Sequence, residues 1–229
     1  MRLNKNNIGQ DTRNRRSKRL RLLGENYSKY SAELPLPVDI VSWIDSCLDN
    51  WEDARTDTEM YKGKVSVAYE VYQTAFKDAG EYYVKLKQLL LALINDLGKG
   101  DEVIPEYGIV GVVPARRALF LTAVVQFKKT SDDLRAAGDG RVLDAGLVNR
   151  LVSKADASYK AWHDAQKQQQ ESVLKTAKQR ELYTGDTIKL RYVYAAAVLA
   201  WGKKSLNLPE LGFEVVHKTG RKKKIVNSE

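Results

Sequence analysis

The chain has 229 residues, enough for one large domain or two small ones around a hydrophobic core. Apolar residues make up 43% and charged residues 29%, a composition that excludes collagen-like, low-complexity and wholly disordered chains. One cysteine, Cys47, and two histidines, His163 and His217, are too few for a disulfide scaffold, a thiolate metal cluster or a multi-histidine metal site. We therefore expect a globular protein with no metal and no other cofactor.

The formal net charge of +9 is concentrated at the two ends of the chain. Residues 1–29 carry a net +7 and residues 218–229 a net +4, whereas the residues between them carry −2. Like charges at a terminus repel one another, which favours an extended or disordered arm until an anionic partner neutralises it. The residues predicted to bind that partner are Arg13, Arg15, Arg16, Lys18, Arg19, Arg21, Lys218, Arg221, Lys222, Lys223 and Lys224.

The predicted elements begin with a basic arm, residues 1–19, which has no apolar run of the kind that a secretory signal needs. The longest apolar stretch, residues 192–201, is too short to span a bilayer. With no export signal, we expect the protein in the cytoplasm or inside an assembled particle.

Three helices are predicted in the next segment, residues 20–113. Leu20, Leu23, Tyr27 and Tyr30 form the face of the first. After the Leu34–Pro37 break, a shorter helix covers residues 40–51. A longer helix covers residues 65–97, where apolar side chains recur every three or four positions for over thirty residues. A short β-prone run, residues 109–113, ends the segment.

Residues 114–217 repeat this order, and residues 218–229 form a basic tail. The predicted helices are 120–127, 147–162 and 173–199, with Ile188, Tyr192, Ala195 and Leu199 on the buried face of the last. Residues 167–170 contain no helix breaker, so one continuous helix in place of the last two is an open alternative. Residues 115–130 also suit a strand, and residues 213–217 are β-prone. The helical spacing of Tyr72, Tyr82, Tyr159 and Tyr192 favours core packing over a stacking or cofactor role.

An internal repeat relates the two segments. Residues 84–113 match residues 188–217 at a constant offset of 104, with nine identities in thirty positions, where chance predicts roughly two. The identical residues are Lys85, Leu86, Ala92, Gly98, Lys99, Pro105, Glu106, Gly108 and Val112, paired with Lys189, Leu190, Ala196, Gly202, Lys203, Pro209, Glu210, Gly212 and Val216. The fold class predicted is therefore all-α, with duplicated three-helix units forming a helical bundle.

Candidate catalytic residues are sparse. Gly202-Lys203 partly fits the end of a phosphate-binding loop, but Lys204 stands where Ser or Thr is needed, so a helix stop is favoured. No spacing supplies His163 with a nucleophile, so a surface histidine is favoured over a catalytic one. Cys47 lies near an apolar helix face and is expected to be a small buried side chain rather than a reactive thiol.

The ends of the two copies carry a resemblance to a known family. Leu93-Ile94-x-x-Leu97-Gly98-Lys99-Gly100-Asp101-Glu102 through Gly108-Ile109, and Ala200-Trp201 through Gly212-Phe213, resemble a helical module of uncharacterised bacterial proteins. In that family the module often precedes fibronectin type III domains, and no catalytic residues come with it. This chain differs by having no fibronectin-like β region and no export signal.

The sequence favours a non-enzymatic helical scaffold or assembly component. Its duplicated body would contact a protein partner or further copies of itself, and its basic ends would engage an anionic partner. The alternative is a dedicated nucleic-acid-binding protein, which would also present a basic face on its folded body. An acidic membrane surface is a third candidate partner, because Leu20, Leu22 and Leu23 stand next to the arginines.

Overall fold

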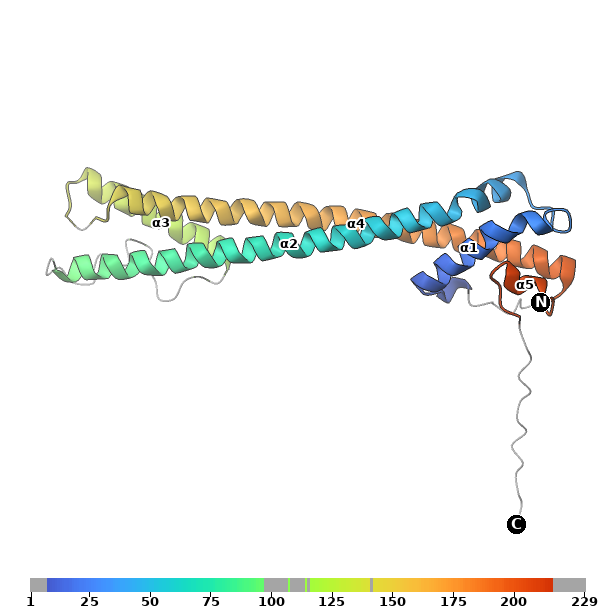
Figure 1. Cartoon of the computed structure of the whole chain (residues 1–229). Coiled ribbons are helices and arrows are strands. Elements are labelled where there is room, and N and C mark those ends of the chain that lie inside the picture. The colour runs from blue at the N-terminus through green and yellow to red at the C-terminus, as the bar shows by residue number, and fades with distance from the viewer. Residues whose placement is uncertain (1–7, 97–106, 108–113, 115, 141, 216–229) are drawn as a thin grey trace, which may run out of the picture. The chain divides into compact units, whose positions relative to one another are not determined.

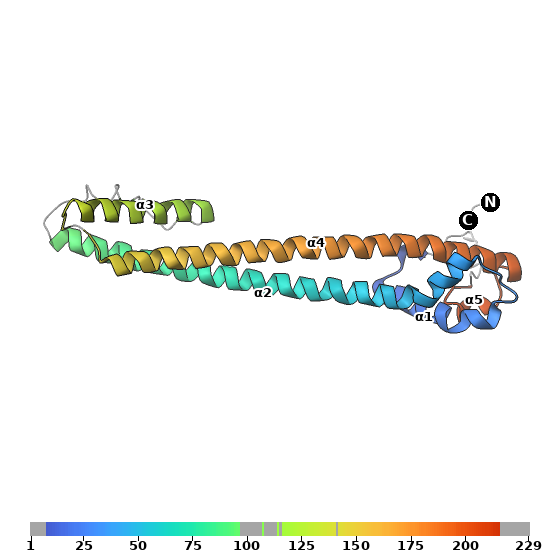
Figure 2. The same cartoon turned by 90° about the horizontal axis from the view of Figure 1, so that it is seen from above.

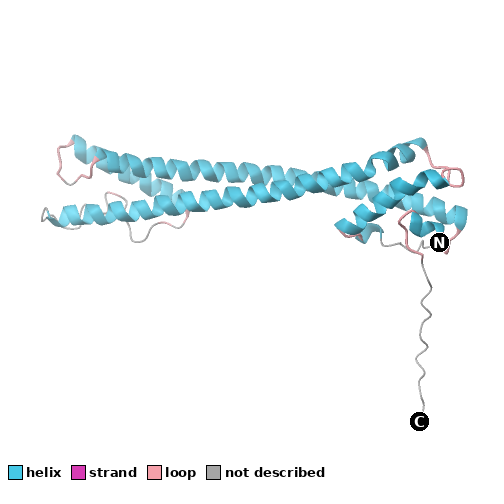
Figure 3. Ribbon diagram, in the orientation of Figure 1, coloured by secondary structure: helices cyan, strands magenta, loops and turns pink. Residues whose placement is uncertain are grey.

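The computed structural model describes residues 8–96, 107, 114, 116–140 and 142–215. Within these residues all regular structure is helical, which confirms the all-α prediction (Figure 3). The elements are η1 (Ile8–Gln10), α1 (Arg13–Tyr30), α2 (Val38–Asp96), α3 (Arg117–Ala136), α4 (Ala145–Trp201) and α5 (Asn207–Glu210), labelled in Figure 1. None of the helices in the described part is both long and apolar enough to cross a membrane.

The chain forms two compact units. The terminal unit comprises residues 1–60 and 173–229, and the central unit comprises residues 61–172. The boundaries between them fall inside α2 and α4. The terminal unit therefore combines segments that are far apart in the sequence, whereas the central unit is one continuous stretch.

The two long helices correct the prediction of three helices in each copy. Residues 40–51 and 65–97 were expected to form separate helices, but residues 40–96 all lie within α2. Residues 147–162 and 173–199 both belong to α4, which confirms the alternative of one continuous helix in this copy. The residues between the expected helices contain no proline, and a glycine such as Gly63 costs a helix only about 1 kcal/mol relative to alanine. Nothing in these segments is strong enough to end a helix.

Helix α1 begins earlier than the sequence suggested. Thr12 caps it, since its hydroxyl oxygen accepts a hydrogen bond from the backbone N–H of Arg15 at 3.3 Å. The expected boundary between an arm and a helix, after residue 19, falls inside α1. The prediction of an extended arm is therefore wrong for residues 13–19.

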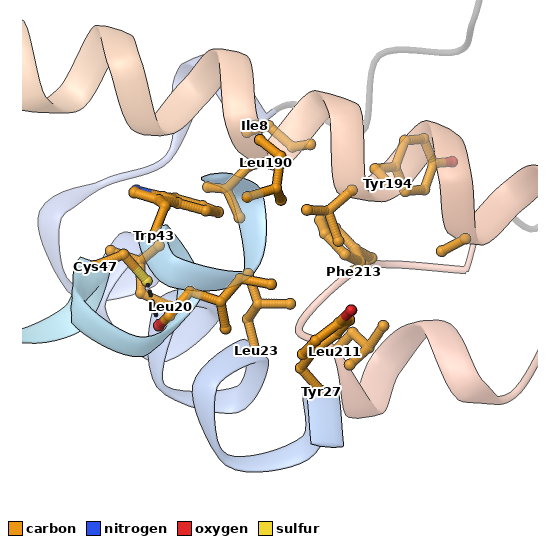
Figure 4. Packing of buried hydrophobic residues seen from close by; sticks show 14 of the residues in the cluster. Ile8, Leu20, Leu23, Tyr27, Trp43, Cys47, Leu190, Tyr194, Leu211 and Phe213 are labelled. Carbon is orange, nitrogen blue, oxygen red and sulfur yellow. Dashed lines mark hydrogen bonds between the residues drawn. The ribbon is translucent and has the colours of Figure 1, made fainter. Parts of the chain in front are cut away.

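The core of the terminal unit gathers side chains from α1, α2, α4 and the segment around α5 (Figure 4). Leu20 and Leu23, predicted to face the core, are fully buried. Cys47 is buried as predicted, and its thiol donates a hydrogen bond to the carbonyl oxygen of Ile44 at 3.3 Å. Burial raises the pKa of this thiol to about 12. Cys47 is therefore protonated and unreactive at neutral pH in the folded protein.

The buried face of α4 in the terminal unit is not the predicted one. Ile188, Tyr192 and Leu199 were expected inside, but they are 63%, 49% and 89% exposed. Leu190, Val193, Tyr194 and Ala197 are buried in their place. Residues 192–201 are apolar around the whole helix, so their spacing allowed more than one face to point inward. Ile188, Tyr192 and Leu199 are therefore left as an apolar row on the surface of α4.

Helix α4 ends at Gly202, as predicted. Gly202 has a φ of +83°, a left-handed conformation that favours glycine, and its N–H donates to the carbonyl oxygen of Val198 at 2.9 Å. This geometry is a helix stop and not the strand-to-helix turn of a phosphate-binding loop.

The core of the central unit is aromatic. α3 lies beside the segments of α2 and α4 that belong to this unit (Figures 1 and 2), and all three helices contribute to one cluster. The ring of Phe120 makes edge contacts with Phe76 and Tyr83, at centroid distances of 5.3 and 5.8 Å. Tyr107 packs against Phe127 at 5.1 Å.

Residues 117–130 are helical, so the strand alternative for this segment is wrong. The β-prone runs predicted at the ends of the two copies lie mostly outside the described residues, which do not include 109–113 and 216–217. Residues 213–215 are described, and they are coil.

Two of the four tyrosines expected in the core, Tyr159 and Tyr192, are 42% and 49% exposed. The other two, Tyr72 and Tyr82, are partly buried. A tyrosine ring can lie at the border between the buried and the exposed face of a helix, because its body is apolar and its hydroxyl is polar. Helical spacing alone therefore did not distinguish tyrosines in the core from those at its edge.

Candidate anion-binding groove

Arg19, predicted to bind an external anion, is bonded to groups inside the terminal unit. Its Nε and Nη2 donate to the two carboxylate oxygens of Asp11, at 2.9 and 3.1 Å. Its Nη1 donates to the carbonyl oxygen of Gly212 at 2.7 Å, and its guanidinium lies 5.5 Å from the ring centre of Phe213. Arg19 is 2% exposed and the side chain of Asp11 is fully buried. The guanidinium therefore ties α1 to the C-terminal segment.

Arg16, three residues earlier on α1, is also buried. Its Nη2 donates to the carbonyl oxygen of Ile8 at 2.9 Å and to the hydroxyl of Thr187 at 2.7 Å. Its guanidinium lies 4.2 Å from the ring centre of Tyr183, and its Nε is 4.0 Å from Asp11 Oδ2. These contacts join η1, α1 and α4.

Two features of the sequence explain why Arg16 and Arg19 are buried. Arg16, Leu20, Leu23 and Tyr27 follow one another at spacings of four, three and four, so the arginine continues the apolar face of α1. Asp11, just before the helix, supplies the opposite charge that a buried guanidinium needs. Packing of the apolar face and pairing with Asp11 outweigh the repulsion between the basic residues of α1.

The exposed basic residues of α1 include two that pair with acidic side chains at the surface. Arg13 lies 3.5 Å from the carboxylate of Glu59. Arg15 pairs with the carboxylate of Glu214. Exposed pairs of this kind contribute about 0–1 kcal/mol, so an external anion can replace the internal carboxylate at small cost.

Lys18 and Arg21 are also exposed on α1. The remaining residues predicted to bind an anion lie outside the described residues: Lys218, Arg221, Lys222, Lys223 and Lys224. In the sequence this tail begins three residues after Val215, a described residue that lines the groove considered next.

A groove lies between α1 and the C-terminal segment of the terminal unit. Arg15, Lys18 and Leu22 share one face of α1 at spacings of three and four residues, and this face forms one side of the groove. Lys204 and Leu206 contribute to the other side. The groove has a volume of about 1010 Å³ and is open to solvent. We call it the basic groove.

The floor of the basic groove depends on a glycine. Gly212 has a φ of +78°, and a β-carbon at this position would meet both the Cα and the carbonyl oxygen of Arg19 at 3.0 Å. Glycine alone allows so close an approach in this left-handed conformation. The approach brings residues 212–215 onto α1, so that Glu214 reaches Arg15.

The charges of the basic groove favour an anion. Arg15, Lys18 and Lys204 are exposed cations along it, and Glu214 is the one carboxylate among the described residues that line it. Lys204 was not among the residues predicted to bind an anion. An anionic group placed in the groove would gain attraction from several cations without displacing a buried contact.

A second buried carboxylate, that of Asp186, interacts with the charge of Arg16. Asp186, on α4, is 5% exposed, and its Oδ1 accepts a hydrogen bond from Trp43 Nε1 at 2.9 Å. Burial raises the pKa of Asp186, while the hydrogen bond from Trp43 and the charges of Arg16 and Lys189 act in the opposite direction. Loss of water around the carboxylate is the largest of these effects.

Replacement of Asp186 with asparagine is expected to change how stability depends on pH. Because the folded pKa is raised, the stabilising contribution of Asp186 is complete below its ordinary pKa of 3.8 and is lost as the pH rises through the folded value. The free energy of unfolding of the wild type, relative to Asp186→Asn, should therefore fall as the pH rises from 3.8. Urea unfolding at a series of pH values measures this difference. An exposed control, Asp45→Asn, should follow the wild type, and a pH-independent difference for Asp186→Asn would contradict the assignment.

The other candidate residues that the structure describes do not converge on a catalytic arrangement. His163 is exposed, as expected, and its ring lies 4.5 Å from that of Tyr159 and 4.9 Å from that of Trp162. His217 lies outside the described residues. Among the residues that are described, no group of three or more His, Cys, Asp and Glu side chains is placed to hold a metal ion.

Comparisons with known proteins leave the fold and the basic groove to be interpreted on their own. The chain matches no protein-family model, no curated protein and no solved structure. The resemblance to a helical bacterial module stays a prediction.

Proposed function

We propose that this protein is a non-enzymatic helical scaffold or assembly component that binds an anionic partner through the terminal unit. The observation that carries the proposal is the basic groove, where Arg15, Lys18 and Lys204 are exposed together. The basic tail, residues 218–229, follows the groove residue Val215 in the sequence and would add to the attraction for the same partner. We place the protein in the cytoplasm or inside an assembled particle.

The apolar row on α4 supports a body that contacts other proteins. Ile188, Tyr192 and Leu199 are exposed large side chains spaced along one face of that helix. An apolar surface of this kind is typical of sites where a protein partner or another copy of the chain packs. None of these three residues lines the basic groove.

We also infer that the body arose by duplication of one helical unit. In both halves of the chain a short helix, α1 or α3, precedes a long one, α2 or α4. Positions 104 residues apart are buried in both halves: Leu86 and Leu190, and Tyr107 and Leu211. Equivalent burial is what two copies of one structural unit would retain.

The alternative function is dedicated nucleic-acid binding. It is supported by Lys18 and Arg21, which are exposed three residues apart on α1 and could contact successive phosphates together with the basic tail. This alternative differs from the scaffold in one measurable way. Affinity for an oligonucleotide would fall steeply and linearly on a plot of log affinity against log salt concentration.

Reversal of charge in the basic groove tests the proposed function. The double variant Lys18→Glu/Lys204→Glu should weaken binding of labelled anionic probes by about tenfold, because each exposed charge contributes up to about 1 kcal/mol. Fluorescence anisotropy with the full chain measures this, using an acidic peptide and a single-stranded oligonucleotide as the probes. Reversal of two exposed charges in the central unit, Arg150→Glu/Lys160→Glu, is the matched control and should have little effect. Equal loss in both double variants, or no binding by the wild type, would contradict the proposal.

A further inference from the structure

We propose that the basic groove binds an acidic polypeptide segment that also carries aliphatic side chains. This inference rests on the proposed function and specifies the chemistry of the partner. It depends on three features of the groove: its charge, its aliphatic walls and the absence of an exposed aromatic ring among the described residues that line it.

The cations of the groove suit the carboxylates of an acidic polypeptide. Glu214 already places a carboxylate on the guanidinium of Arg15, at the edge of the groove. An acidic side chain of a partner could take the same place, because both groups of this pair are about half exposed and the exchange leaves no charge buried alone. Lys18 and Lys204 then offer two further positions for carboxylates.

The walls of the groove add apolar contacts. Leu22 on α1 and Leu206 and Val215 on the opposite side line it between the cations, and Leu206 is 83% exposed. A partner that covered these side chains would gain hydrophobic free energy that a purely charged ligand cannot provide. The groove volume of about 1010 Å³ is at the upper end of small-molecule sites, which suits a length of polypeptide.

Nucleic acid fits these walls less well. Proteins that bind single strands stack the bases on exposed aromatic rings, and the aromatic residue that lines this groove, Phe213, is 1% exposed. The aliphatic walls would lie against sugar and phosphate groups with little gain from burial.

The inference is tested with three labelled probes on the full-length protein. The first is a short peptide of glutamate, leucine and serine, the second the same peptide with serine in place of leucine, and the third a single-stranded oligonucleotide of equal charge. We expect the first probe to bind about tenfold more tightly than the second, since burying one leucine side chain contributes at least that factor. Lys18→Glu and Leu206→Ser should each weaken the binding of the first probe.

Two matched variants control for effects elsewhere. Lys160→Glu reverses an exposed lysine of the central unit, and Leu174→Ser removes a leucine that is 69% exposed on α4. Neither should change the affinity for the leucine-containing peptide. Leu206 is exposed, so Leu206→Ser should keep the helical circular dichroism of the wild type.

Each other outcome has a defined meaning. Equal affinity for the two peptides, or no effect of Leu206→Ser, would overturn the inference and leave the proposed function standing. Loss of oligonucleotide binding in Lys18→Glu without loss of peptide binding would overturn it in favour of nucleic acid. Failure of all three probes to bind would contradict both the inference and the proposed function.

Discussion

Replacement of Arg19 with methionine is expected to destabilise the terminal unit by about 3–5 kcal/mol, because it leaves the buried carboxylate of Asp11 without its main partner. The variant also removes the donor to the carbonyl oxygen of Gly212, which holds the C-terminal segment on α1. Urea unfolding followed by circular dichroism measures the change. Such a loss is far larger than any expected for a lysine or arginine in an unstructured arm.

Two further variants separate this explanation from a general effect of charge. Arg21→Met removes an exposed arginine from the same helix and should change the unfolding free energy by less than about 0.5 kcal/mol. The double variant Asp11→Asn/Arg19→Met should recover part of the stability lost in Arg19→Met, because it removes the buried carboxylate that has lost its main partner. If Arg19→Met and Arg21→Met are equally stable, the buried ion pair does not hold the N-terminal segment.

Replacement of Phe120 with alanine is expected to destabilise the central unit by about 3–5 kcal/mol, the usual range for removing a large buried aromatic side chain. Phe120 is fully buried and contacts the rings of Phe76 and Tyr83, so the cavity would lie in the centre of the aromatic cluster. Differential scanning calorimetry or urea unfolding measures the loss.

The neighbouring residue provides the control. Leu119 is 56% exposed on the same helix, and Leu119→Ala should change stability by no more than about 0.5 kcal/mol. The buried positions on α3 also include Val124 and Phe127, four and seven residues after Phe120, which is the period of a helix. Comparable losses for Leu119→Ala and Phe120→Ala would contradict this assignment of faces.

Where one apolar face was clear in the sequence, it predicted the fold well. Leu86 and Leu90 are buried as the long repeat of apolar spacings in residues 65–97 indicated, and Leu20 and Leu23 are buried as well. On α4 the same reasoning failed at Tyr192 and Leu199, because residues 192–201 are apolar on every side of the helix and only the packing partners decide which face turns inward. The length of α2 was missed because a weak interruption was interpreted as a helix end, whereas a continuous α4 was one of the alternatives that the sequence left open.

The site could be predicted only in part. The basic segment of residues 13–21 was identified from charge, yet charge alone could not show that Arg16 and Arg19 are structural. A signal was present, since Arg16 stands four residues before Leu20 on the apolar face and Asp11 lies nearby. Lys204 had no such signal. It lines the groove because the segment after α4 packs on α1, where Gly212 contacts Arg19, a residue nearly two hundred positions away.

Hydrogen–deuterium exchange of the full chain, with and without a saturating acidic peptide, tests the account most directly. Without peptide, the amides of residues 16–27 should exchange slowly, as expected for a helix packed into the core of the terminal unit. With peptide, added protection should be confined to α1 and residues 204–215, which together form the basic groove. Rapid exchange throughout residues 13–30, or protection by the bound peptide at other segments only, would contradict a folded basic helix that binds its partner through this groove.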